Sequence, residues 1–79
     1  MSEPSAVGVE PRAKKALADS PVAALRELRV ESVDESSLLI SGSVSTFYHK
    51  QLAQEVVRAV AMGLEVINSV TVQHGPGDE

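Results

Sequence analysis

The spacing of apolar residues changes several times along the chain, and each change predicts a new element. From Pro11, which suits the first turn of a helix, apolar residues recur at helical spacing and leave charged residues on the other side. Ser20 precedes a proline, which disfavours the helical conformation for Ser20. The sequence therefore predicts a first helix that starts at Pro11 and is broken or kinked near Asp19 and Ser20.

Two runs with a period of two follow this helix. In the first run, Leu28 and Val30 share a face, and charged residues occupy the opposite face. The second run, residues 37–45, comes after turn-forming residues at 34–36. Its apolar face comprises Leu38, Ile40, Gly42 and Val44. The two runs predict a β-hairpin with one buried face.

Helical spacing returns after Thr46 and ends near Gly63, a residue type that often terminates helices. The stripe expected to be buried comprises Leu52, Ala53, Val56, Ala59 and Val60. A last alternating segment then places Val66, Val70 and Val72 on one face. The connection between the second and last strands is long enough for a right-handed crossover, which would make those two strands parallel.

This order of elements predicts an α+β fold, a two-layer αββαβ sandwich. We expect a three-stranded mixed sheet with two helices on one face, because so short a chain cannot form two cores. The order of the strands is left open. Residues 1–10 and 74–79 show no period, so we expect a disordered N-terminal arm, a domain over residues 11–73 and a disordered C-terminal tail.

Composition narrows the possible functions. The 79 residues are 43% hydrophobic and include one Phe, one Tyr and no Cys, so the core must be aliphatic and thiol chemistry is excluded. The net charge is -4, but four of the eleven carboxylates lie near the ends, and the remaining seven balance seven basic residues. This balance gives little attraction for nucleic acid or anionic lipid. We see no membrane-spanning segment and no signal peptide, expect a soluble chain, and leave its compartment open.

Candidate catalytic chemistry is sparse. His49 and His74 are far apart in sequence and lack a pattern of further metal ligands, and no serine lies in a G-x-S-x-G turn. A core this small also leaves little room for a pocket of about 300 Å³. We therefore predict no enzymatic activity, no catalytic or metal-binding residue and no cofactor.

Four residues are expected to have structural roles. Gly42 should allow a close approach beneath a helix, Gly63 should end the long helix, and Asn68 should cap or turn the chain at the entry to the last strand. Phe47 is expected to close an edge of the core, whereas for Tyr48 a core role and a binding role are equally supported.

The outer side of the long helix is the candidate interaction face. Its residues are Tyr48, Lys50, Gln54, Arg58 and Met62, with Gln51, Glu55 and Ala61 on the same side. A solvated face is the simpler interpretation, and a weak docking patch for protein or lipid headgroups is the alternative.

Several segments in order resemble the BON domain, a bacterial osmotic-stress and nodulation-type domain. The resemblance rests on LRV at residues 28–30, LLISGSVS at 38–45, FYHKQLAQE at 47–55 and VINSVTV at 66–72. It implies an αββαβ sandwich without catalytic residues, in proteins that are usually periplasmic or envelope-associated. It also implies binding to a phospholipid surface or to an envelope or protein partner, often in osmotic-stress protection.

Other functions are weighed against this one. A protein–protein or oligomerisation module without lipid binding is the main alternative, and the oligomeric state is left open. An RNA-binding module would need a basic face with aromatic residues or a GXXG loop, and the sequence has neither. We therefore expect no nucleic-acid partner.

Overall fold

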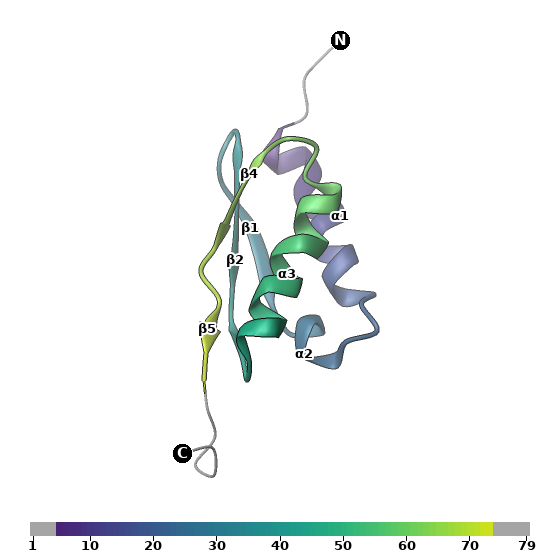
Figure 1. Ribbon diagram of the computed structural model, residues 1–79. Coiled ribbons are helices and arrows are strands. Elements are labelled where there is room, and N and C mark those ends of the chain that lie inside the picture. The colour runs from purple at the N-terminus through teal and green to yellow at the C-terminus, as the bar shows by residue number, and fades with distance from the viewer. Residues whose placement is uncertain (1–4, 74–79) are drawn as a thin grey trace.

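The computed structural model describes residues 5–73, in which helices cover one side of a β-sheet (Figure 1). The elements, in chain order, are α1 (Ala6–Ala18), α2 (Ala23–Arg26), β1 (Arg29–Asp34), β2 (Ser37–Ser41), β3 (Ser43–Val44), α3 (Phe47–Val60), β4 (Glu65–Asn68) and β5 (Thr71–Val72). The three-stranded sheet has the order β1-β2-β4 and is mixed. The predicted α+β sandwich is confirmed.

The sheet combines a hairpin with a crossover. β1 pairs antiparallel with β2, and Val30 lies opposite Ile40. α3 then returns the chain so that β4 runs parallel to β2, with Leu38 opposite Val66, as the length of the connection predicted. Beyond Gly42 the same pair of segments continues as β3 and β5, which are also parallel.

α1 begins five residues before the predicted start at Pro11. Ser5 caps the helix because its Oγ accepts a hydrogen bond from the backbone N–H of Gly8 at 3.2 Å. Ala6 and Val9 are buried and extend the apolar stripe of the helix toward its N-terminus. Their burial outweighs the backbone hydrogen bond that Pro11 cannot donate. The predicted arm is therefore wrong for residues 6–10, whereas residues 1–4 and the predicted tail at 74–79 lie outside the described residues.

The predicted break between the first two helical segments is confirmed. α1 ends at Ala18, and Ser20 Oγ accepts a hydrogen bond from the N–H of Val22. Arg26 also stabilises this loop, because its Nε donates a hydrogen bond to the carbonyl of Ser20 at 2.8 Å. The loop lets α2 turn Leu25, which is fully buried, into the core.

The core is aliphatic, but the buried face of α3 differs from the predicted stripe. Ala53 and Val57 are its fully buried residues, and Ala59, which was expected in the core, is exposed. Ala61, expected on the outer side, is only 2% exposed. The helix is rotated so that residues four apart, Ala53 and Val57, face the interior. The fully buried large side chains are Leu17, Leu25, Leu38, Ile40, Val57 and Val70.

Gly42 lies at the break between β2 and β3, where the backbone adopts a φ of +124°. A Cβ atom at this position would lie 2.7 Å from Leu28 Cδ2. The neighbour that requires glycine is therefore Leu28, just before β1, and not a helix as expected. Gly63 has a φ of +88° in the turn after α3, so it too holds a conformation that other residues rarely adopt.

Asn68 joins the sheet to α3. Its Nδ2 donates to the carbonyl of Lys50 at 2.9 Å and to Gln54 Oε1 at 3.2 Å. Its Oδ1 accepts from the N–H of Val70 at 3.2 Å, which turns the chain between β4 and β5. One side chain thus links α3 to the backbone between β4 and β5.

The contact at Gly42 predicts a large loss of stability on substitution. Gly42→Val should lower the free energy of unfolding by about 1–3 kcal/mol, because the new side chain overlaps Leu28 and strains a positive φ. Urea denaturation followed by circular dichroism measures this change. Gly8→Ala is the matched control, since its Cβ would meet only Ser5 Oγ, at 3.4 Å, and it should not destabilise the domain. Equal midpoints for Gly42→Val and the wild type would contradict this interpretation.

Candidate binding surface

Two adjacent aromatic side chains project from the first turn of α3. Phe47 is 71% exposed and Tyr48 is 69% exposed. We call these two residues the aromatic tip. Phe47 does not close the core as predicted, because it lies outside the Ala53–Val57 stripe through which α3 contacts the sheet.

The backbone at the aromatic tip is held by a helix cap. Thr46 is extended, with φ -139° and ψ 153°, and its Oγ1 accepts from the N–H of His49 at 3.1 Å. The rings of Tyr48 and His49 are 5.7 Å apart and inclined at 51°. The cap fixes the backbone of the first turn, and the ring contact places Tyr48 beside His49.

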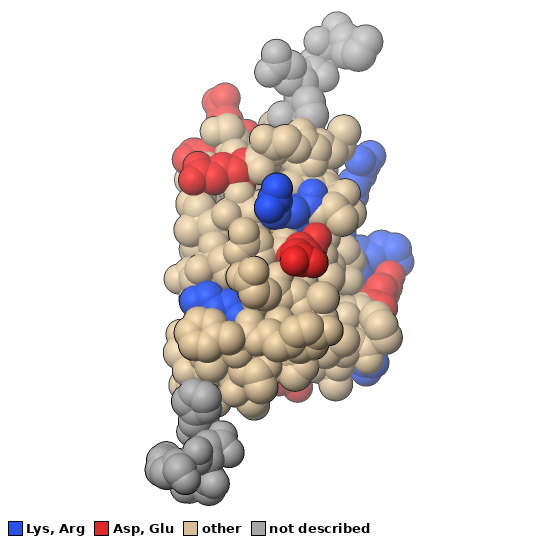
Figure 2. Space-filling model, in the orientation of Figure 1, with Lys and Arg blue, Asp and Glu red and all other residues tan. Residues whose placement is uncertain are grey.

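The surface around the start of α3 carries little charge. Figure 2 shows a broad uncharged area at the lower end of the molecule, over the beginning of α3, with charged side chains at its margins. Lys50 is the nearest basic residue along the helix, and it is half-buried. The aromatic tip therefore belongs to a largely uncharged end of the domain.

The five residues of the predicted interaction face do not form one patch. Tyr48 and Met62 are separated by the length of α3, roughly 20 Å at the usual helical rise. Gln54 binds Asn68 through its side chain, and Lys50 does so through its carbonyl. Met62 is 55% exposed, and its Sδ accepts from Arg12 Nη1 at 3.5 Å, whereas Arg58 is exposed on the outer side.

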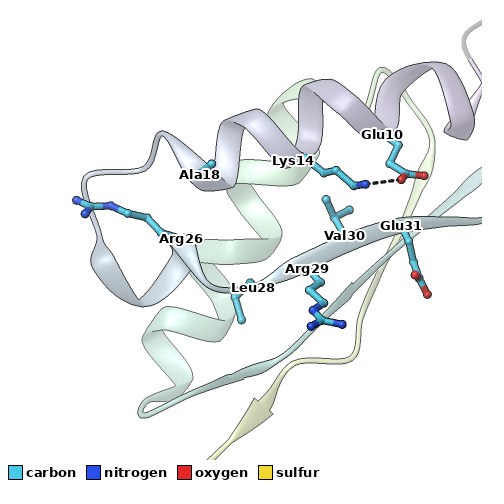
Figure 3. A pocket seen from close by; sticks show the side chains of 8 residues that line it. All are labelled: Glu10, Lys14, Ala18, Arg26, Leu28, Arg29, Val30 and Glu31. Carbon is cyan, nitrogen blue, oxygen red and sulfur yellow. Dashed lines mark ion pairs between the residues drawn. The ribbon is translucent and has the colours of Figure 1, made fainter.

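A groove that the sequence did not indicate lies between α1 and β1 (Figure 3). Its volume is about 320 Å³, but it does not test the expectation that a core this small has little room for a pocket of about 300 Å³. The space is at the surface and not in the core. It is lined by Glu10, Lys14, Ala18, Arg26, Leu28, Arg29, Val30 and Glu31.

Within this groove, Glu10 connects α1 to the edge of β1. Its carboxylate lies 2.9 Å from Lys14 Nζ and accepts from the backbone N–H of Ser32, also at 2.9 Å. The hydrogen bond from Lys14, followed by that from Ser32, lowers the pKa of Glu10 from 4.5 to about 2. The spacing of Glu10 and Lys14 suits a helical ion pair, a signal that was missed because Glu10 was assigned to the arm.

The described residues give no sign of a metal centre or a membrane span. Residues 5–73 contain no cluster of three or more His, Asp or Glu side chains arranged to hold a metal ion. In the same range, no helix has the length and apolar character needed to cross a bilayer. His49 contributes a ring contact, and His74 lies outside the described residues.

Comparison with protein families identifies the fold. The sequence model of the BON domain family matches residues 8–74, which is most of the chain. The chain belongs to the BON domain family. A search of curated proteins found no match. BON domains are generally noncatalytic binding modules.

The BON match also bears on the ends of the domain. It begins within α1, so residues 8–10 belong to the matched region as well as to the helix. It includes every later element of the sheet and the whole of α3. The aromatic tip and the α1–β1 groove both lie inside the matched region.

The ion pair at Glu10 predicts a change in acid stability. A carboxyl whose pKa is lowered by folding stabilises the native state above its unfolded value of 4.5 and loses this effect as the pH falls toward about 2. The free energy of unfolding of the wild type should therefore fall across this range, and Glu10→Gln should fall less steeply. Urea titrations at several pH values measure both slopes.

Glu55→Gln is the control for this experiment. Glu55 is exposed on α3 and forms no ion pair or hydrogen bond among residues 5–73, so its removal should leave the slope close to that of the wild type. The interpretation fails if Glu10→Gln and Glu55→Gln show the same pH dependence.

Proposed function

We propose that this BON domain is a noncatalytic module that binds the surface of a phospholipid membrane through its aromatic tip. The observation that carries the proposal is the exposure of Phe47 and Tyr48, which lie next to each other on a capped helical turn. They are also the only aromatic residues of the chain. The core is built without them, so their exposure does not serve its packing.

The chemistry of these side chains suits the boundary between lipid and water. Transfer of a large apolar side chain out of water contributes about 1.5–3 kcal/mol when burial is complete. Tyrosine combines an apolar ring with a hydroxyl that can stay hydrated, which is why it is common at membrane interfaces. Two such rings on one turn can enter the headgroup region together without moving the backbone.

The charge of the domain indicates how this contact should respond to salt. Away from the chain ends, the numbers of basic and acidic residues are nearly equal. The surface around the aromatic tip is mostly uncharged. Electrostatic attraction to anionic headgroups would weaken as salt screens it, whereas apolar insertion would not. A part in osmotic-stress protection is supported by family membership alone.

Vesicle flotation tests this proposal. The wild type should float with phosphatidylcholine vesicles, and its bound fraction should change little between low and high salt. The double variant Phe47→Ser, Tyr48→Ser should bind at least about tenfold more weakly, because two exposed rings are removed from the contact. Both substitutions are at exposed positions, so the variant should remain folded.

Val33→Ser is the matched control. Val33 is 47% exposed and lies on β1, whereas the aromatic tip lies on α3. It should float like the wild type. Binding that is lost at high salt, or equal binding by the aromatic-tip variant and the control, would refute the proposed surface. Absence of binding to any vesicle would favour a protein partner instead.

A further inference from the structure

The last two strands of the domain form a sheet edge whose backbone groups face outward. The N–H groups of Glu65, Ser69, Thr71 and Gln73 donate to carbonyls of residues 36, 40, 42 and 44. Backbone groups alternate in direction along a strand, so those of Val66, Asn68, Val70 and Val72 point away from the sheet. Figure 1 shows β4 and β5 along the outer margin of the sheet, away from α1.

Three of these outward N–H groups are free to bind another strand. The N–H of Val70 is taken by Asn68 Oδ1. Among the hydrogen bonds of residues 5–73, none engages the N–H of Val66, Asn68 or Val72. A free strand edge of this kind is a template for pairing with a further strand.

At the opposite edge of the sheet, one outward N–H is bound by a side chain. There, the outward N–H of Ser32 on β1 donates to the Glu10 carboxylate, and α1 packs beside the strand. Such use of a charged side chain is a common way to prevent edge-to-edge pairing. The β4–β5 edge has no equivalent, because residues 66–73 contain neither a charged residue nor a proline.

We propose that the β4–β5 edge binds the same edge of a second copy of this chain, in an antiparallel arrangement around a two-fold axis at Ser69. In this register Val66 faces Val72 of the second copy, and Asn68 faces Val70. Each free N–H then donates to an outward carbonyl of the second copy. The N–H of Val66 donates to the carbonyl of residue 72, the N–H of Asn68 to that of residue 70, and the N–H of Val72 to that of residue 66.

The charges and side chains of the edge are compatible with a second copy. Glu65 is the only charged residue on β4 or β5, and in this register it lies opposite Gln73, so no like charges oppose one another. Ile67 and Thr71 lie opposite each other on the exposed face of the sheet, and both types favour strands. The contact involves two short strands from each copy, whereas a standard stable interface buries roughly 1,200–2,000 Å², so we expect a weak dimer.

Sedimentation equilibrium of the full chain, at micromolar and millimolar concentrations, tests this arrangement. The wild type should approach twice the monomer mass at millimolar concentration. Ile67→Lys combined with Thr71→Lys places like charges opposite each other and should yield a monomer. Ile67→Lys combined with Thr71→Glu places opposite charges in the same register and should restore the dimer. Val33→Lys, on β1, should dimerise like the wild type.

A wild type that stays monomeric at millimolar concentration would overturn the proposal, as would a Lys–Lys variant that still dimerises. Amide hydrogen exchange gives a second measurement that needs no variant. Exchange at Val66, Asn68 and Val72 should slow as the concentration rises, whereas exchange at Val30, on the edge beside α1, should not change. Equal behaviour of the two edges would also overturn it.

Discussion

A layer of aliphatic side chains between the helices and one face of the sheet holds this domain together. Leu38 and Ile40 supply the centre of the sheet, and Leu17 of α1 and Val57 of α3 belong to the same buried cluster. Because the chain is short, its buried apolar residues form one interior. Binding must then depend on what the packing leaves outside, which is why exposed apolar residues such as Phe47 are informative.

Much of the fold could be predicted from the spacing of apolar residues. The alternation at Leu28 and Val30, and again at Leu38 and Ile40, marks strands with one buried face, and the structure has them. The length of the helical connection was enough to predict the parallel pairing of β2 and β4. These features follow from local periods and chain length, which a single sequence contains.

Features that depend on contacts between distant residues could not be predicted in this way. The start of α1 depends on burial of Ala6 by elements that come later in the chain. The position of Phe47 depends on the rotation of α3, since an aromatic residue in an aliphatic sequence is otherwise expected in the core. The Glu10–Ser32 hydrogen bond joins residues 22 positions apart, and the α1–β1 groove is lined by residues of both elements. Only the folded chain brings these residues together.

In our proposal, this BON domain acts through the surface at the start of α3 and not through an interior site. Chemical-shift mapping of the backbone amides during titration with phosphatidylcholine nanodiscs tests it most directly. We expect changes confined to the first turns of α3 and to the adjacent β3 and β5, with little change in the α1–β1 groove. Changes confined to the groove, with none at Phe47 and Tyr48, would contradict it.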